Sequence, residues 1–206
     1  KKTFQIFAGD LDENGDHDVV LAKMSRNKLI PVRGKECSTQ EMPFVSEKFK
    51  TYDAFAKATL IDIYTPEKLS TAFNKTIENF QHLYIENLGG NSFKVDTLPH
   101  MTQIGTIKDF IVQDFNGDGN LDFLYGGNHY STEVETVRYD ANKGGLCLGD
   151  GKGKFTSVAL KSSDLYLRGD VRDLEIINIK GQNYVIATVN NNRLITQKLP
   201  DSILRK

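Results

Sequence analysis

The feature that most constrains this chain is a nine-residue acidic pattern that occurs twice. The copies run from Asp10 to Asp18 and from Asp114 to Asp122, with oxygen-bearing side chains at the first, third, fifth and ninth places and glycine at the sixth. Calcium binds six to eight oxygen atoms, and a tight loop with alternate side chains turned inward supplies most of them. Glycine at the sixth place allows the positive φ that such a loop needs. The pattern therefore predicts a calcium ion in each loop.

The candidate ligands are the oxygen-bearing side chains of the two loops, with the seventh place offering its backbone carbonyl. They are Asp10, Asp12, Asn14, Asp16 and Asp18 in the first loop, and Asp114, Asn116, Asp118, Asn120 and Asp122 in the second. A simpler interpretation is that Asn-Gly and Asp-Gly only mark turns. Turn chemistry accounts for the glycines but leaves the grouped carboxylates repelling one another without a cation between them.

Two observations argue against the EF-hand, which is the nearest alternative loop. An EF-hand needs a bidentate Glu at its twelfth place, where this chain has Leu21 and Tyr125. The runs that flank the loops are short and rich in β-branched and aromatic residues, which is typical of strands: 4–8, 19–21, 110–112 and 123–125. We therefore expect each metal loop to be the turn of a β-hairpin.

The composition is that of an ordinary globular protein, with 206 residues, 39% hydrophobic and 26% charged residues, and a net charge of -1. Such a charge gives no reason to expect nucleic acid, and no apolar run approaches the roughly 20 residues of a membrane span. The chain starts in a strand pattern without a signal-peptide segment, so we expect a mature or trimmed piece. Cys37 and Cys147 allow one disulfide at most, and two unpaired buried residues are the favoured interpretation.

The order of strand and turn signals predicts a mainly β, antiparallel fold over 1–206, treated as a single domain. Its units look like propeller blades, about three to four in number, so they form a partial propeller with two short inserted helices. The expected segments are a blade with a calcium loop (4–35), a helical insertion (44–73), blades with the second calcium loop (76–160) and a degenerate blade (165–199). The polar stretch 34–43 is expected to be a loop. Thr51 and the pair Thr65–Pro66 carry the start signals of the two helices.

At the two acidic loops the sequence resembles the FG-GAP/VCBS-repeat family of calcium-loop β-propeller blades. Further stretches look like the C-terminal part of bacterial, Bacteroidetes-type VCBS proteins that are associated with an ASPIC/UnbV segment. These stretches are Arg33–Phe44, Asn87–Phe93, Phe110–Asp114, Gly126–Asn128 and Leu148–Phe155. The resemblance extends over most of the chain, and the acidic motifs are its most specific part.

The resemblance implies an extracellular or outer-membrane-associated protein whose propeller is a binding surface for a protein or glycan at the cell surface. It also implies that the side chains at places one, three, five and nine bind calcium in both loops. The sequence departs from the family pattern at Asn14 and Asn116, where an amide replaces an acid, which we expect to lower calcium affinity. The segment 165–199 lacks the loop and should bind no calcium there.

The competing function is an enzyme, or an accessory domain of one, that acts on polysaccharide. A glycosidase needs two carboxyl groups about 5–9 Å apart across a cleft, and metal-bound acids would be poor acids or bases. The remaining candidate acids lie in one stretch: Glu133, Glu135 and Asp140. Four tyrosines would favour sugar stacking if they clustered on one face: Tyr64, Tyr130, Tyr139 and Tyr166. The sequence singles out neither a catalytic residue nor an organic cofactor.

Overall fold

The computed structural model describes residues 3–134 and 136–199. The chain divides into two compact units, Lys1–Phe80 and Gln81–Lys206, where the sequence analysis expected one domain. The fold is mainly β, as predicted, with 41% of the residues in strands and 19% in helices. The strands form several antiparallel sheets, and none of these closes into a barrel within the described residues.

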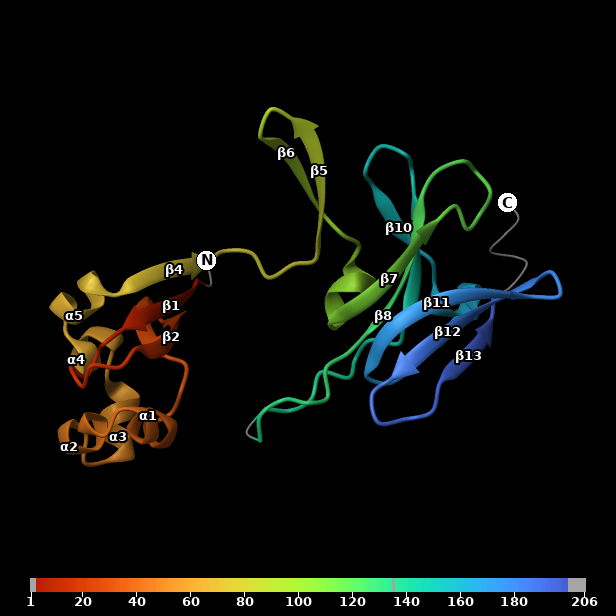
Figure 1. Cartoon of the computed structure of the whole chain (residues 1–206). Coiled ribbons are helices and arrows are strands. Elements are labelled where there is room, and N and C mark those ends of the chain that lie inside the picture. The colour runs from red at the N-terminus through yellow and green to blue at the C-terminus, as the bar shows by residue number, and fades with distance from the viewer. Residues whose placement is uncertain (1–2, 135, 200–206) are drawn as a thin grey trace. The chain divides into compact units, whose positions relative to one another are not determined.

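The first unit combines one sheet with a group of short helices (Figure 1). Its elements are β1 (Phe4–Gly9), β2 (Asp18–Ser25), β3 (Lys28–Pro31), α1 (Lys35–Glu41), α2 (Phe44–Lys48), α3 (Tyr52–Lys57), α4 (Leu60–Tyr64), α5 (Pro66–Thr71) and β4 (Phe73–Ile77). The sheet order is β3-β2-β1-β4. The predicted sequence of strand, acidic loop, strand, turn and strand is therefore present in 4–31. A fourth strand, β4, comes from the end of the expected helical insertion and pairs with β1.

The helical part is larger than the two short helices that we expected. Residues 35–71, all of which the structure describes, contain five helices, and α1 occupies the stretch 34–43 that we expected to be a loop. The first predicted start signal is confirmed, since the Thr51 hydroxyl accepts a hydrogen bond from Ala54 N. The second is confirmed in part, since Pro66 opens α5 but Thr65 makes no side-chain capping hydrogen bond. Helices this short show little periodicity in sequence, because they depend on packing rather than on propensity.

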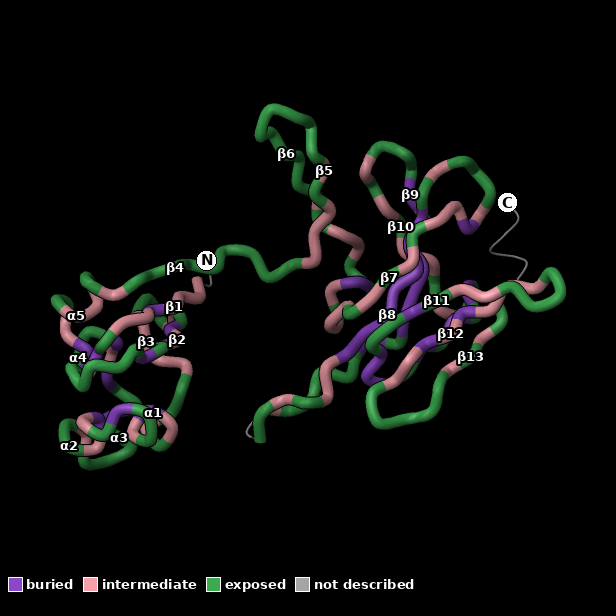
Figure 2. Tube along the Cα trace, viewed as in Figure 1, coloured by how far each residue is buried: buried purple, intermediate pink, exposed green. Residues whose placement is uncertain are grey.

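Packing against the sheet holds these helices in place. The core of the first unit joins Phe7, Val20 and Ala22 of the sheet to Val45, Phe55, Leu60, Ile63 and Tyr64 of the helices. In β2 the buried residues alternate with more exposed ones, so that one face of the strand meets the helices (Figure 2). Thr59 and Asp62 complete a capping box that starts α4.

The second unit is built from a hairpin and two sheets. Its elements are β5 (Leu83–Gly89), β6 (Ser92–Thr97), the 3-10 helix η1 (His100–Ile104), β7 (Ile107–Gln113), β8 (Asp122–Gly127), β9 (Gly145–Gly149), β10 (Phe155–Ser157), α6 (Leu160–Ser163), β11 (Val171–Ile179), β12 (Gln182–Val189) and β13 (Ile195–Lys198). The sheet orders are β5-β6, β10-β9-β8-β7 and β11-β12-β13. The expected degenerate segment 165–199 is thus the three-stranded sheet, and β11 and β12 are joined by a short turn at Lys180–Gly181.

A core shared by the two larger sheets holds the second unit together. Leu124 and Leu146 from β8 and β9 pack with Leu174 and Val185 from β11 and β12, and all four are almost completely buried. Phe115, from the second acidic loop, belongs to the same core. Cys147 is buried in β9 near the Ser157 hydroxyl, and burial raises the pKa of its thiol to about 11, so it acts as a packing residue.

Among the described residues, no helix has both the length and the apolar character needed to cross a membrane.

The separate cores predict how two truncations should behave. Leu60→Ala and Leu124→Ala each remove a fully buried side chain, one from each unit, and each should lower the free energy of unfolding of its own unit by about 2–5 kcal/mol. We expect hydrogen exchange to accelerate only in the unit that carries the substitution. Faster exchange in both units from either change alone would contradict separate cores.

Candidate metal centre

The first acidic loop is the turn of the β1–β2 hairpin, as the sequence predicts. The last residue before the loop, Gly9, pairs with its ninth-place residue Asp18. Asp10, Asp12 and Asp18 each present a carboxylate oxygen, and these oxygens lie within 4.8 Å of one another. Three carboxylates this close repel one another strongly unless a cation lies between them. The arrangement has the chemistry of a hard-cation site.

The second acidic loop has the same position in the β7–β8 hairpin, where Gln113 pairs with the ninth-place residue Asp122. Its internal hydrogen bonds repeat those of the first loop place by place. In both loops the first-place carboxylate accepts from the N–H groups of the fifth and sixth places, the third place accepts from the fifth, the fifth from the seventh, and the ninth from the second. The donor–acceptor distances are 3.0, 3.0, 3.3, 2.7 and 2.8 Å in the first loop and 3.2, 2.9, 3.0, 2.8 and 2.9 Å in the second.

The backbone conformation of the loops is also shared. Gly15 and Gly119 at the sixth place have φ values of 95° and 87°, in the region that glycine occupies at low cost. The fourth place is left-handed in both loops as well, with φ 66° at Glu13 and 76° at Gly117. Two copies that agree in hydrogen bonds and in backbone therefore form one structural repeat.

The second place of each loop has a role that the sequence analysis missed. Leu11 and Phe115 are almost fully buried, and each donates its backbone N–H to the ninth-place carboxylate. The apolar side chain anchors the loop in the core while the carboxylate closes it. A large apolar residue at the second place of both copies was the available signal, but it was obscured by the more conspicuous acids.

The ninth place distinguishes the two loops. Asp122 is completely buried, and both of its carboxylate oxygens accept backbone hydrogen bonds, from Phe115 N at 2.9 Å and from Gly149 N at 2.9 Å. The second bond ties the loop to β9. Asp18 accepts backbone hydrogen bonds from Leu11 and Asp12, both within its own loop, and belongs to the three-carboxylate cluster. Asp122 is thus engaged in structure, whereas Asp18 faces other carboxylates.

Electrostatics reflect the same difference. Burial raises the pKa of Asp18, and the nearby charges of Asp12 and Glu41 raise it further, although the hydrogen bond from Leu11 N lowers it. In the second loop, hydrogen bonds from Asn120 N–H and from the Asn116 amide lower the pKa of Asp118. The first loop therefore has carboxylates whose charge is poorly compensated, which is the condition that a bound cation relieves.

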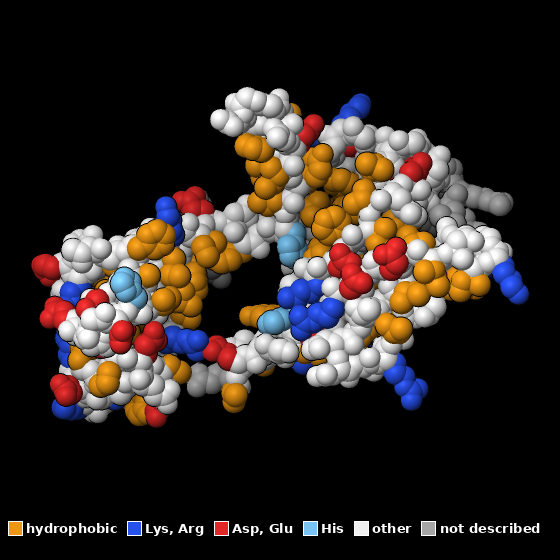
Figure 3. All heavy atoms as spheres, viewed as in Figure 1, with side chains coloured by type: hydrophobic (Ala, Val, Ile, Leu, Met, Phe, Trp, Pro, Cys, Tyr) orange, Lys and Arg blue, Asp and Glu red, His pale blue; other side chains and the backbone are white. Residues whose placement is uncertain are grey.

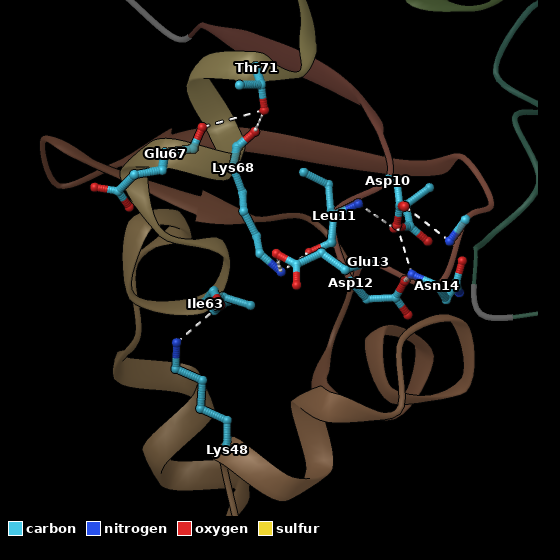
Figure 4. A network of polar contacts seen from close by, with 12 residues as sticks. Asp10, Leu11, Asp12, Glu13, Asn14, Lys48, Ile63, Glu67, Lys68 and Thr71 are labelled. Carbon is cyan, nitrogen blue, oxygen red and sulfur yellow. Dashed lines mark hydrogen bonds and ion pairs between the residues drawn. The ribbon is translucent and has the colours of Figure 1, made fainter.

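A lysine approaches the first loop at another point. Figure 4 shows Lys68 reaching from α5, with its Nζ 3.1 Å from Glu13 Oε1 and donating to the Leu11 carbonyl at 2.9 Å. Glu13 is the fourth-place residue and does not belong to the three-carboxylate cluster. Lys68 thus fastens the loop to α5 by its outer side.

The structure brings the predicted ligands together to different degrees. Among the described residues, one group of three acidic side chains meets the geometry of a metal site, and it lies in the first loop. In the second loop the third place is Asn116, whose Nδ2 donates to Asp118 Oδ2 at 2.9 Å. Asp16 and Asn120 donate their own backbone N–H groups to the fifth place, and their carbonyls stay the expected ligands.

The other sequence candidates do not gather into a second site. Asp140 forms an ion pair with Arg138 at 3.1 Å, and Glu133 accepts from the Thr136 hydroxyl. Glu135 lies outside the described residues. Tyr64 is buried in the core of the first unit, so it is not part of an exposed tyrosine cluster. The side chain of Arg138 lies over the Tyr130 ring, and that of Lys143 over the Tyr166 ring, while Tyr139 is half exposed.

No protein-family model, no curated protein and no solved structure matches the chain.

The contrast between Asp18 and Asp122 predicts opposite effects of the same substitution. Asp122→Asn leaves one buried N–H without an acceptor, so it should lower the free energy of unfolding by about 1–3 kcal/mol both with calcium and with chelator. Asp18→Asn keeps an oxygen for Leu11 N and removes a poorly solvated charge. It should therefore not lower stability in chelator. Chemical denaturation of both variants measures the difference.

The raised pKa of Asp18 makes the stability of the protein in chelator depend on pH. Because the folded-state pKa of Asp18 is raised, its contribution is present below the unfolded pKa and is lost as the pH rises through the folded pKa. Asp18→Asn should then be stabilising relative to the parent protein at pH 7, and this advantage should vanish near pH 3. An advantage that is equal at both pH values would exclude ionised Asp18 as its cause.

Proposed function

We propose that this protein is a calcium-stabilised binding module, in which calcium in the acidic hairpin loops has a structural role. The observation that carries the proposal is the cluster of Asp10, Asp12 and Asp18, whose ligand oxygens lie within 4.8 Å of one another in a hairpin turn. The recurrence of the same hydrogen-bond pattern in the second loop supports a common purpose for both turns.

The first loop has a donor set that suits calcium. Carboxylate and amide oxygens from Asp10, Asp12, Asn14 and Asp18, with the carbonyl of Asp16, would supply hard oxygen ligands of the kind calcium prefers. The backbone hydrogen bonds to Asp10, Asp12 and Asn14 use one lone pair of each accepting oxygen and leave another for a metal. They also hold the side chains in place before the ion arrives, which lowers the entropic cost of binding.

The second loop would bind the ion more weakly. Asn116 replaces an acid at the third place, and both oxygens of Asp122 already accept backbone hydrogen bonds. We propose Asp114, Asn116, Asp118 and Asp122 as ligands there, with the Asn120 carbonyl. Because Asp122 also holds Gly149 N, an ion in this loop would stabilise the connection between β8 and β9.

We further propose that the module belongs to the FG-GAP/VCBS-repeat group and is a partial propeller of about three to four blade units. The supporting observation is that each acidic hairpin opens a four-stranded antiparallel sheet. Millimolar calcium outside the cytosol would fill such loops, which favours an extracellular or outer-membrane-associated location. The function would then be recognition of a protein or glycan at the cell surface.

Thermal unfolding with calcium, magnesium or chelator tests the calcium role. A ligand that binds only the folded state stabilises it by about 2.7 kcal/mol at 100 times its dissociation constant. We expect millimolar calcium to raise the Tm and magnesium to raise it much less, because magnesium dehydrates reluctantly and demands octahedral geometry.

Two variants of the first loop sharpen the test. Asp12→Asn removes a charge from the three-carboxylate cluster and should reduce the calcium-dependent shift in Tm, whereas Glu13→Gln makes the same chemical change one residue away, outside the cluster. If calcium shifts the Tm of both variants equally, or does not shift the Tm of the parent protein, the calcium role is wrong and the loops are ordinary turns.

Recognition is tested separately on an array of glycans and on intact bacterial cells, with the labelled protein in calcium or in chelator. Binding that requires calcium is the expected result. If the Tm depends on calcium but the protein binds neither glycans nor cells, the structural role of calcium stands and the proposed cell-surface recognition is wrong.

A further inference from the structure

The sheet formed by β7–β10 has apolar side chains on both of its faces. One face contributes Leu124 and Leu146 to the core shared with β11–β13. The other face carries Phe123, Tyr125 and Cys147, against which Phe155 and Ile107 pack. An antiparallel sheet that is apolar on both faces needs a covering layer on both, because exposed apolar area is unfavourable in water.

The hairpin β5–β6 covers this second face only in part. Its base is fixed to the sheet, since the rings of Tyr84 and Phe155 meet edge to face with their centroids 5.4 Å apart. Farther along the hairpin, Lys94 Nζ donates to the Lys152 carbonyl at 3.3 Å. A cavity of about 770 Å³ remains between the base of the hairpin and the sheet, lined by Leu83, Leu98, Phe110, Val112 and Leu121 among others. Figure 3 shows hydrophobic side chains over the hairpin and over the adjoining sheet.

Large apolar residues are exposed both on the hairpin and in the cavity lining. Seven of them, which we call the apolar surface, are each between 50% and 64% exposed: Ile85, Leu88, Phe93 and Val95 on the hairpin, and Phe110, Val112 and Leu121 in the cavity lining. Ile85 and Val95 are directly paired across the hairpin, and Phe110 and Val112 alternate along β7. Soluble monomers rarely expose continuous apolar patches beyond a few hundred Å², and larger patches mark interaction sites.

The apolar area of this surface matches the apolar part of a standard protein interface. Half of a large aromatic side chain offers about 100 Å², and half of an aliphatic side chain offers about 50 Å². The two aromatic and five aliphatic residues of the apolar surface therefore offer about 450 Å², and a stable interface buries about 800 Å² on each partner, of which about 57% is non-polar. The net charge of -1 adds little repulsion between two copies of the chain.

We propose that the apolar surface is the interface with a second copy of this chain. One subunit carries both a projecting hairpin with apolar residues and a hollow lined by apolar residues. The hairpin is held at its base by the contact of Tyr84 with Phe155, and it leaves the hollow beside it open. A two-fold axis allows each copy to place its hairpin against the hollow of the other, so both apolar regions are buried in one closed, isologous contact.

Sedimentation velocity of the full chain over a concentration series, in calcium and in chelator, tests this proposal. We expect a reversible dimer in both buffers, because the apolar surface acts independently of the metal. Phe93→Lys on the hairpin and Phe110→Lys on β7 should each raise the dimer dissociation constant at least about 30-fold. These side chains are more than half exposed, so the variants should keep the parent Tm under conditions where the protein is monomeric.

Matched controls place the same charge on exposed apolar residues elsewhere. Ile179 lies in β11 and is 47% exposed, and Leu194 lies next to β13 and is 62% exposed. The variants Ile179→Lys and Leu194→Lys should dimerise like the parent protein. The proposal is wrong if the parent protein stays monomeric even at about 100 times the protein concentration of a usual assay. The apolar surface would then bind another partner. Equal weakening by the control variants would also overturn the proposal.

Discussion

The closure of both acidic loops depends on one hydrogen bond, from the backbone N–H of the second place to the carboxylate of the ninth. It is 2.8 Å long at Leu11–Asp18 and 2.9 Å long at Phe115–Asp122. The bond closes the loop beyond the last strand pair of the hairpin, while the buried second-place side chain holds the closed loop to a core. The closure brings the ninth-place carboxylate to the other acids, which are held by hydrogen bonds within the loop.

The two loops share this closure, but the charge of the ninth-place carboxylate is compensated differently in each. At Asp122 a second backbone donor, Gly149 N, satisfies the carboxylate, so the charge is stabilised by the protein itself. At Asp18 the neighbours include the carboxylates of Asp10 and Asp12, so the charge is less well compensated by the protein. The strand beside the hairpin makes the difference: β9 reaches Asp122 through Gly149 N, whereas β3, at the corresponding place beside β2, pairs only with Ala22–Ser25.

The extent to which the sequence predicts this structure follows from the range of the interactions involved. The hairpin turns at Asp10 and Asp114 were predictable because their signals are local: turn glycines between two β-rich runs. The helix α1 and the pairing of β4 with β1 were not predictable, because both involve partners far along the chain: Glu36 and Glu41 of α1 accept hydrogen bonds from Tyr52 and Val19, and β4 pairs with the first strand. The ninth-place difference was hidden for the same reason, since Gly149 is 27 residues away from Asp122. The structure describes two of the three candidate acids, Glu133 and Asp140. Their partners, the Thr136 hydroxyl and Arg138, were not predicted from the sequence.

The same reasoning separates the two kinds of surface on the second unit. Along β7 the consecutive residues Phe110 and Ile111 point to opposite faces of the sheet, and both are apolar. A strand with one solvated face would carry polar residues at every second position, so the composition of β7 is that of a strand covered on both sides. In the acidic loop that follows β7, residues 117–119 are exposed to solvent, whereas Phe115 and Asp122 are buried. The apolar residues therefore indicate which face of the sheet needs a cover, whereas the carboxylates mark the proposed ion site. Leu121 and Asp122, which are neighbours in the chain, both line the cavity, one with an apolar side chain and the other with a carboxylate.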